Sequence, residues 1–372
     1  MKFSINRAEL LAAAKSMLKV VPASSPMKEL EGFLVESDED AGEIIMTATN
    51  MTSSIQRRLP AQVRITGSCV INARLLTGMC AILRGDTVYF EKLSNGTVYV
   101  SSLTCNYNIS ALPVSGYPKP VLPFPDDTIK VSGIRDLYAA TAASVGRDMS
   151  RPALTGVHLE IYSDCVRATS CDTFRLATVK RESETGGALS VVIPKISLQD
   201  LAGAVTNEDV LEVGVCGGTL VFIKRGLIFS TRLIDEAYID TDKMLAGIES
   251  CYIAKVDGKQ LADAIGAVSV IADSAPDCGG HIVNMCFTAG EIVLSARNEL
   301  SAQRVSAPAS VSKETPDGGF WYNPRHFADC FKTVGGAIEL HVAKTGVLLI
   351  RGAGAQYMLL NVRPPKQARA AA

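Results

Sequence analysis

The feature that most constrains this chain is a strand-then-helix pattern that occurs three times in order. It opens the chain as FSINRAELLAAAKSML, recurs as IKVSGIRDLYAATAASV from Ile129, and returns as IAKVDGKQLADAIGAVSV from Ile253. In each copy a polar residue precedes an alanine-rich stretch with apolar residues at helical spacing, and an equivalent leucine marks the helix: Leu10, Leu137 and Leu261. The copies lie roughly 125 residues apart, close to the size of one small domain. This period is too long for a solenoid and predicts three similar domains.

A second landmark follows inside each copy. It reads VINARLLTGMCAIL from Val70, VIPKISLQDLAGAV from Val192 and WYNPRHFADCFKTV from Trp321. Each is a short apolar strand, a polar or proline break, and an amphipathic helix. Alternating strands with hairpin signals come next: VYFEKLSNGTVYVSS, LEVGVCGGTLVFIKR and IELHVAKTGVLLIRG. Two landmarks that recur in the same order make chance resemblance a weak alternative. We therefore predict three α+β domains, each with two helices and about eight strands, over residues 1–125, 126–248 and 249–372.

Composition indicates a globular chain and sets limits on its partners. Hydrophobic residues make up 47% of it, charged residues 20%, and the formal net charge is −1. That charge argues against a non-specific nucleic-acid coat, although a local basic surface stays open. The ten cysteines include no CxxC pair and lie mostly in apolar surroundings, which indicates a reduced interior. The start lacks a signal peptide, and no apolar run reaches the roughly 18 residues of a membrane span. We expect a soluble, cytoplasmic protein.

No catalytic or cofactor motif is found. The patterns GxxxxGK[ST] and GxSxG are absent, and Gly352-Ala353-Gly354 suits a hairpin turn better than a dinucleotide site. His326 and Cys330 stand four apart on a predicted helix, but two ligands do not make a zinc site. The acidic groups at 38–40 and 126–127 lie in polar, turn-like segments. We predict no catalytic site, no metal and no cofactor. The alternative is an α+β enzyme with an unrecognised active site.

A set of motifs in fixed order carries a family resemblance. Each is weak alone, but together they are specific: MKFSINRAELL, Ala111-Leu112-Pro113, Gly116-Tyr117-Pro118, Arg151-Pro152-Ala153-Leu154-Thr155-Gly156, Asp172-Thr173-Phe174-Arg175-Leu176-Ala177, Ile193-Pro194-Lys195, Arg232-Leu233-Ile234-Asp235, Tyr322-Asn323-Pro324-Arg325 and Tyr357-Met358-Leu359-Leu360-Asn361-Val362-Arg363. With them the chain resembles, over nearly its whole length, the beta subunit of bacterial DNA polymerase III, the sliding clamp. The resemblance implies three tandem clamp domains, helices lining a central pore, sheets outside, and a head-to-tail ring homodimer. It implies a non-catalytic processivity factor that encircles duplex DNA and tethers the replicative polymerase.

Three segments depart from the family pattern. Pro26-Met27-Lys28-Glu29-Leu30 stands where Thr-Leu-Pro-Ile-Leu is usual, and Asp172-Thr173-Phe174-Arg175-Leu176 replaces Asp-Gly-His-Arg-Leu. The usual ending Met-Pro-Met-Arg-Leu becomes Leu360-Asn361-Val362-Arg363-Pro364, followed by a tail to Ala372. Phe174 fills a position that usually holds a smaller, more polar ring. We therefore expect a more apolar partner pocket and a shifted peptide preference.

The resemblance also implies three sets of site residues. A sliding ring needs phosphate contacts without base readout; the candidates in the pore are Arg74, Arg147, Arg151 and Lys195, with Lys15 and Lys19 on the first helix. For each, an ordinary solvated charge is the alternative. The partner pocket should lie on the second and third domains and comprise Leu154, Cys171, Thr173, Phe174, Arg175, Leu176, Ile239, Lys243, Met244, Val347, Met358, Leu360, Asn361, Val362 and Arg363. The alternative for Leu154, Leu176 and Leu360 is that they are ordinary core residues with no role in binding.

The third set is the subunit contact. Tyr107 and Ile109, on an expected edge strand, should pack against Val270 and Ile271 of a second subunit. A ring dimer would have about twice the mass of the 39.5 kDa chain, which separates it from the enzyme alternative. The partners expected besides duplex DNA are the polymerase alpha subunit, clamp-loader subunits, repair polymerases and mismatch-repair proteins, all bound through short peptide motifs. No membrane partner is expected, and the location should be the nucleoid.

Overall fold

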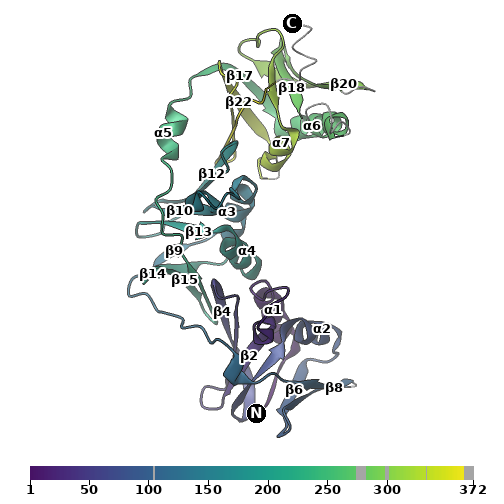
Figure 1. The fold of residues 1–372 in the computed structure, drawn as a ribbon, viewed down its shortest axis with the longest axis vertical. Helices are drawn as coiled ribbons and strands as arrows, with labels where there is room; N and C mark the ends of the chain where they lie inside the picture. Colours follow the sequence, from purple (N-terminus) through teal and green to yellow (C-terminus); the bar gives the residue numbers. More distant parts are fainter. Residues whose placement is uncertain (104, 274–281, 298–300, 332, 364–372) are drawn as a thin grey trace. The chain divides into compact units, whose positions relative to one another are not determined.

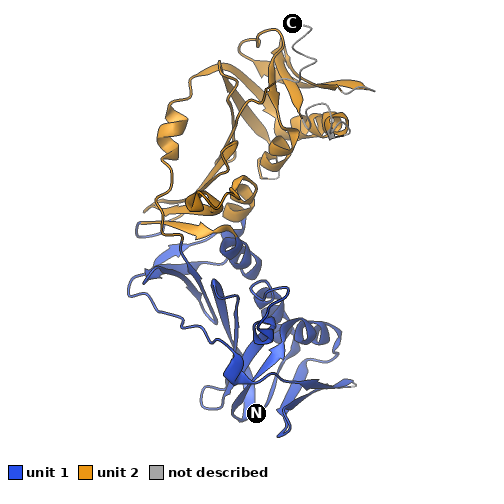
Figure 2. Ribbon diagram, viewed as in Figure 1, with its two compact units in different colours: residues 1–135, 184–188, 196–233 blue, residues 136–183, 189–195, 234–372 orange. Residues whose placement is uncertain are grey.

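The computed structural model describes residues 1–103, 105–273, 282–297, 301–331 and 333–363. It divides into two compact units, shown in blue and orange in Figure 2. Unit 1 comprises residues 1–135, 184–188 and 196–233, and unit 2 the remainder. The units divide the predicted middle domain between them, so the predicted domain boundaries stay a prediction. No helix in the described ranges is long and apolar enough to cross a membrane.

Unit 1 is built on one 12-stranded sheet (Figure 1). Its main path runs β8-β7-β6-β1-β4-β16-β15-β14-β9. A branch leaves β4, in which β3 pairs with β4, β2 with β3, and β5 with β2. The strands are β1 (Lys2–Asn6), β2 (Gly32–Asp38), β3 (Glu43–Thr49), β4 (Ser53–Ile65), β5 (Gly67–Asn72), β6 (Thr87–Lys92), β7 (Thr97–Ser102), β8 (Cys105–Ser110), β9 (Ile129–Val131), β14 (Leu211–Cys216), β15 (Thr219–Lys224) and β16 (Leu227–Arg232). The helices are α1 (Arg7–Met17), α2 (Ala73–Ile82) and, apart from its first residue, α4 (Lys195–Ala204).

Unit 2 holds a second 12-stranded sheet, in the order β13-β10-β11-β12-β24-β23-β22-β17-β20-β19-β18-β21. Its strands are β10 (Gly156–Ile161), β11 (Cys165–Cys171), β12 (Arg175–Glu182), β13 (Leu189–Pro194), β17 (Ser250–Asp257), β18 (Val283–Thr288), β19 (Glu291–Arg297), β20 (Ala302–Val311), β21 (Phe320–Tyr322), β22 (Ala337–Ala343), β23 (Leu348–Gly352) and β24 (Ala355–Leu359). Its helices are α5 (Thr241–Ala246), α6 (Gly258–Asp273), α7 (Pro324–Cys330) and most of α3 (Ile134–Thr141).

The predicted repeat of strand and helix is confirmed. Strands β1, β9 and β17 each precede a helix, and the marker leucines Leu10, Leu137 and Leu261 are all buried, at 1% exposure or less. Within the described residues, β1–β8, β9–β16 and β17–β24 fall in the three predicted ranges. The α+β fold class is therefore correct.

Local chemistry explains where these elements begin and turn. The side chain of Asn6 caps α1 by accepting hydrogen bonds from the backbone of Ala8 and Glu9. The predicted turn at Gly352-Ala353-Gly354 does join β23 to β24, with φ of 48° at Ala353 and 73° at Gly354. Positive φ at both central residues is the geometry of a tight hairpin turn.

Two strand pairings, each inside one unit, join successive repeats and are built alike. In unit 1, β16 pairs antiparallel with β4 and sets Leu227 opposite Arg57. In unit 2, β24 pairs antiparallel with β12 and sets Ala355 opposite Val179. Each time, the last strand of one repeat completes the long strand of the repeat before it. We call these two pairings the internal junctions.

Candidate functional site

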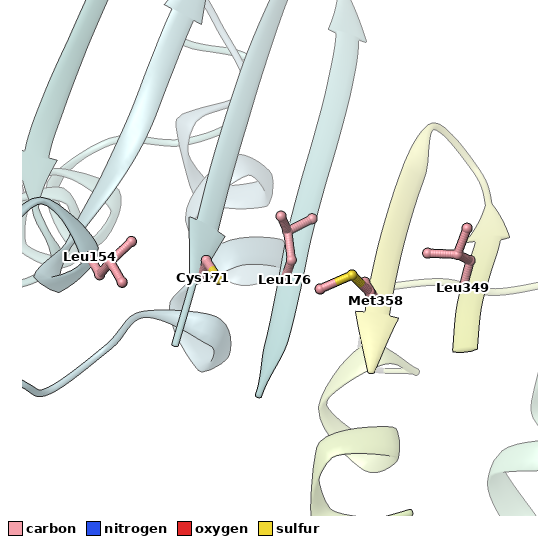
Figure 3. Packing of buried hydrophobic residues seen from close by; sticks show 5 residues of the cluster. All are labelled: Leu154, Cys171, Leu176, Leu349 and Met358. Carbon is pink, nitrogen blue, oxygen red and sulfur yellow. The ribbon is translucent and has the colours of Figure 1, made fainter. Parts of the chain in front are cut away.

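An apolar cluster in unit 2 gathers many of the predicted pocket residues (Figure 3). Its buried members are Leu154, Cys171, Leu176, Leu349 and Met358. Cys171 lies opposite Leu176, Leu176 opposite Met358, and Met358 opposite Leu349. Cys171, Leu176, Met358 and Leu349 therefore form one row across β11, β12, β24 and β23. Cross-strand neighbours of this kind pack directly against each other. Leu154 joins the row from the short 3-10 turn Pro152–Thr155.

A second layer covers this row. It consists of Tyr238, Met244, Leu245, Ile248 and Val347, all partly buried. Four of the five belong to residues 234–249, which we call the strap and which contain α5. The structure thus brings together six predicted pocket residues: Leu154, Cys171, Leu176, Met244, Val347 and Met358.

The strap residues Tyr238, Leu245 and Ile248 and the strand residue Leu349 were missed from the sequence. Leu349 could have been found, because it lies in a short apolar run of a predicted hairpin strand, and its neighbours Leu348 and Ile350 are buried as well. The strap residues carry no such signal, since they lie in and around one short helix whose position depends on tertiary contacts.

A cavity of about 460 Å³ lies beside the cluster, also within unit 2. Its lining includes Leu154, Thr173, Phe174 and Arg175 from the predicted pocket. The same lining includes three residues predicted to contact DNA: Arg147, Arg151 and Lys195. Two sets of residues predicted separately therefore surround one hollow.

The cavity is rich in positive charge. Arg175 is neutralised by ion pairs with Asp172 at 2.9 Å and Asp329 at 2.7 Å. Within the described ranges, no carboxylate lies at ion-pair distance from the other three cations: Arg147, Arg151 and Lys195. Burial lowers the pKa of Lys195, and the charges of Arg147 and Arg175 lower it further. An anionic group entering the cavity would relieve this repulsion.

Phe174 stands at the rim of the cavity, 61% exposed. Its backbone oxygen accepts a hydrogen bond from the Leu360 amide at 2.9 Å, which fastens the exit of β24 to the rim. Thr173, which fills the position of the usual glycine, has φ of 74°. An exposed phenyl ring and a strained β-branched neighbour therefore distinguish this rim.

The other predicted pocket residues lie outside both the cluster and the cavity lining. Ile239 and Lys243 are exposed on the strap, and Leu360 is 37% exposed. The Val362 amide bonds to the Trp321 carbonyl at 2.8 Å, and the side chain of Asn361 accepts from the Trp321 amide. Asn361 and Arg363 are exposed. Pro364 and the tail lie outside the described residues.

The remaining basic candidates all belong to unit 1 and are exposed. Arg74 lies on α2 and donates to the Pro22 carbonyl at 3.3 Å. Lys15 lies in the last turn of α1. The placement of Lys19 on that helix is wrong, because α1 ends at Met17 with Leu18 as its cap.

The residues predicted at the subunit contact differ in exposure. The strand β8 is an edge strand of its sheet, as predicted. On it Tyr107 is half-buried, whereas Ile109 is buried within its own chain at 7% exposure. Val270 and Ile271 lie on α6, where Val270 is 68% exposed and Ile271 half-buried.

Comparison with known proteins identifies the family. The model of the DNA polymerase III beta subunit N-terminal domain matches residues 1–123, and that of its central domain matches residues 128–240. The beta sliding clamp of Bacillus subtilis is 24% identical over 364 residues, covering 94% of each chain. That of Streptomyces coelicolor is 27% identical over 342 residues, covering 88% of this chain and 87% of the other.

The fold agrees with these matches. The crystal structure of the DNA polymerase III beta subunit from Thermotoga maritima superposes with a TM-score of 0.88 at 18% identity, covering 98% of this chain and 99% of that one. The family models together span more than half of the residues. The chain belongs to the DNA polymerase III beta subunit family, the bacterial sliding clamps, which are non-catalytic processivity factors.

Proposed function

We propose that this chain works as a sliding clamp by closing a head-to-tail ring of two copies around duplex DNA. Family membership supplies the function of a DNA polymerase processivity factor. The observation that carries the ring is the repetition of the internal junction. Two of three repeats have their long strand completed by the last strand of another repeat. Among the described residues, the long strand of the third repeat, β20, has no such partner strand.

The two strands left over are β8 and β20. In the described part of the chain, β8 pairs only with β7, and residues 302–308 of β20 pair only with β19. By repeat position, β8 is equivalent to β16 and β24, while β20 is equivalent to β4 and β12. An edge strand exposes unpaired backbone N–H and C=O groups that can hydrogen-bond to a strand of another chain. If β8 of each copy pairs with β20 of the other, the two identical contacts close a ring of two copies.

The internal junctions also fix the register of this contact. Each long strand follows a hairpin, and its first residue paired with the preceding strand marks an equivalent position: Ser54, Leu176 and Ala302. Ser54 lies opposite Ser230, and Leu176 opposite Met358. Carrying this register to the third repeat sets Ala302 opposite Asn108 of a second copy, and Val305 opposite Cys105.

Burial supports the same pairing. The residues equivalent to Tyr107 are Phe229 and Tyr357, which are 0% and 2% exposed at the internal junctions. Tyr107 is only half-buried in the single chain. A second copy that covers β8 would complete its burial.

A single substitution tests the register. The amides of Arg58 and Lys180 bond to the carbonyls of Gly226 and Gly354 across the junctions. The next pairs along, which are equivalent to Val305 and Cys105, are therefore of the non-hydrogen-bonded type, with Cα atoms about 4.5 Å apart. This separation permits a disulfide. Val305→Cys should form an intersubunit disulfide with the natural Cys105 under mild oxidation, and a non-reducing gel should show a doubled mass.

Two matched controls lie on the same strand. Gln303→Cys faces Tyr107 in the proposed register, and Arg304→Cys faces Asn106, so neither meets a cysteine. Both should stay monomeric on the gel while remaining dimers by light scattering. Cross-linking of Arg304→Cys in place of Val305→Cys would show that the register is wrong by one residue.

The DNA contact proposed is electrostatic and blind to sequence. Arg147, Arg151 and Lys195 share the cavity without a carboxylate partner, and Arg74 is exposed on α2. Replacing all four by alanine should flatten the salt dependence of retention on DNA, since each lost phosphate contact lowers the number of counterions that binding releases.

After loading onto a nicked circular plasmid by the clamp loader of the same organism, the wild-type chain should leave when the plasmid is linearised. Retention on linear DNA would contradict topological linkage.

The partner site proposed is the apolar cluster with its cavity. A short peptide with apolar anchors suits the row of leucine and methionine side chains, and an acidic group beside them suits the three cations. Polymerase, clamp-loader and repair subunits would share this site, in the cytoplasm at the nucleoid. Fluorescence anisotropy with a labelled C-terminal peptide of the replicative polymerase measures the binding.

A further inference from the structure

We propose that the strap, residues 234–249, is a lid over the partner site, and that the ion pair between Arg167 and Asp242 is its latch. This inference rests on the proposed peptide site and adds a means of regulating it. In the closed position the anchors, which are the side chains of Leu154, Leu176 and Met358, are at most 7% exposed. The strap must therefore move before a peptide side chain can pack fully against them.

The burial of the anchors carries the first step. Leu154, Leu176 and Met358 are 7%, 0% and 6% exposed. Leu176 lies on β12 and Met358 on β24, and Leu154 joins them from the 3-10 turn Pro152–Thr155. Tyr238, Met244 and Leu245 of the strap pack against this cluster. An apolar side chain from a partner therefore takes a place that strap side chains occupy in this structure.

The strap is attached almost entirely by side chains. At its start, the Ile234 amide donates to the Val192 carbonyl at 3.0 Å, and the Ala153 amide donates to the Glu236 carboxylate at 3.2 Å. Beyond these, the backbone hydrogen bonds of residues 237–249 described in the structure stay inside the strap. A segment held at its ends and not by a strand ladder can lift without breaking the sheet.

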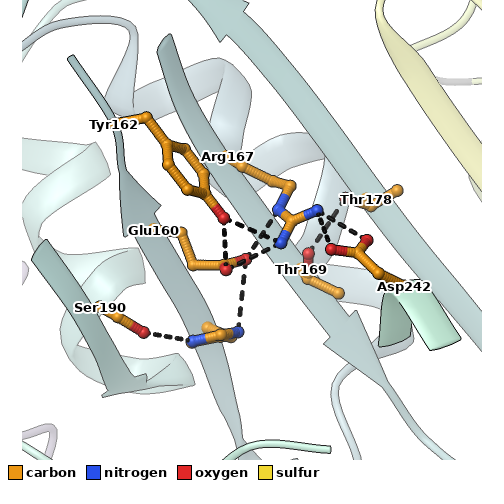
Figure 4. A network of polar contacts seen from close by, with 8 residues as sticks. Glu160, Tyr162, Arg167, Thr169, Thr178, Ser190 and Asp242 are labelled. Atoms are coloured by element: carbon orange, nitrogen blue, oxygen red, sulfur yellow. Dashed lines mark hydrogen bonds and ion pairs between the residues drawn. The ribbon is translucent and has the colours of Figure 1, made fainter. Parts of the chain in front are cut away.

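Arg167 provides the charged one of these side-chain attachments (Figure 4). Its guanidinium group donates to both carboxylate oxygens of Asp242, at 2.7 and 2.9 Å. It also donates twice to Glu160, at 2.7 and 2.8 Å, and once to the Tyr162 hydroxyl at 3.1 Å. Arg167 and Glu160 lie on β11 and β10, so this side of the latch belongs to the rigid sheet.

Asp242 forms the movable side of the latch. It stands in the first turn of α5, and its side chain is 67% exposed, against 20% for Arg167. Water and salt reach the carboxylate, so the pair is easily screened and broken. When the strap lifts, Arg167 keeps Glu160 and Tyr162 as partners and is not left unpaired.

Tyr238 makes the closed position less stable than its packing suggests. Its ring stacks on His158 with centroids 4.9 Å apart. Its buried hydroxyl lies near the Cys171 backbone but meets no hydrogen bond of full geometry in the described part of the chain. A buried hydroxyl without a partner destabilises the state that buries it, and lifting the strap returns it to water. The ion pair of Arg167 with Asp242 thus helps to hold closed a strap that buries an incompletely hydrogen-bonded hydroxyl.

The test is Asp242→Ala, which breaks the latch and leaves the rest of the Arg167 network in place. The full-length dimer is mixed with a fluorescein-labelled C-terminal peptide of the replicative polymerase, and association and dissociation rates are measured by stopped-flow anisotropy. A weakened latch makes the open state more populated, so the variant should associate faster and bind about two- to fivefold more tightly. Raising the salt concentration should reduce this difference between variant and wild type.

Lys255→Gln is the matched control, because it removes another exposed ion pair of unit 2, with Glu339 at 2.7 Å. It should leave both rates unchanged. Slower association or weaker binding in Asp242→Ala would overturn the lid, since the pair would then position the site and not close it. Equal binding by variant and wild type would overturn the lid while the peptide site stands. Failure of every form to bind the peptide would overturn the site and the lid together.

Discussion

At the residue scale, one turn design recurs at the internal junctions. Asp172 accepts hydrogen bonds from the amides of Phe174 and Arg175 at 3.1 and 3.0 Å. Asn50 accepts equivalent bonds from Thr52 and Ser53 at 3.0 and 2.7 Å. The residue after each cap, Thr173 or Met51, is forced to φ of 74° or 72°. The repeat thus conserves a strained turn in two places within one chain.

Thr173→Gly should relieve this strain. A β-branched residue is disfavoured at positive φ, whereas glycine adopts it freely, so the variant should be more stable by about 1 kcal/mol despite its more flexible unfolded chain. Urea unfolding measures the change. Met51→Gly should gain a similar amount. A loss of stability in both variants would contradict the strain argument.

Asp200 should make stability depend on pH. Burial on α4 raises the pKa of its carboxyl to about 7, opposed by a hydrogen bond from Asn50 and by the charge of Lys19. Because the folded pKa lies above the unfolded one, the folded chain binds the proton more tightly. Stability should therefore fall as pH rises from about 4 to about 7, by an amount on the order of a few kcal/mol. In Asp200→Asn this fall should disappear, as thermal unfolding at pH 5 and pH 8 would measure. An unchanged profile would assign the dependence to other groups.

At the element scale, β24 has two roles. It completes the internal junction with β12, and it contributes Met358 to the apolar cluster. Leu359 is core, at 2% exposure, while Leu360 beyond it is 37% exposed. Residues up to Leu359 are therefore needed for the fold, whereas Leu360 can contribute to the site alone.

Truncation after Leu359 should separate the two roles. It removes Leu360 with its bond to the Phe174 carbonyl and the two bonds of Asn361 and Val362 to Trp321, but it spares every β24 pair. We expect peptide affinity to fall several-fold, because an exposed apolar anchor beside the rim is lost. The thermal midpoint and the dimer by light scattering should change little. Loss of the dimer would mean that the last residues serve the fold and not the site.

At the scale of the whole molecule, the proposed ring needs an exposed apolar face on α6. Val270→Glu should give monomers by light scattering, because a charge would be buried on closure without a partner. Val270 is 68% exposed in the single chain, so the variant should fold. Val121→Glu, at a residue that is 90% exposed in the segment between β8 and β9, should stay dimeric. A charge at Ile109 would be a poor test, since that side chain is already buried in its own subunit.

The sequence by itself determined the repeated fold. Marker leucines at helical spacing and alternating strands report local geometry, which depends on neighbours along the chain. For the same reason, Gly352-Ala353-Gly354 was predictable as a turn, and the strand that carries Tyr107 and Ile109 as an edge strand. Family motifs then identified the sliding clamp and named most of the cluster, because each anchor lies in a segment that the motifs cover.

Only the tertiary structure decided how these segments combine. The row from Cys171 to Leu349 exists because β12 pairs with β24, which is a contact between residues far apart in sequence. The strap over this row, and the cavity shared by Phe174 and Lys195, follow from packing that no local pattern encodes. Burial in particular is a property of the folded chain: the sequence marks Leu176 and Val270 as equally apolar, but the fold buries Leu176 beneath the strap and leaves Val270 exposed on α6.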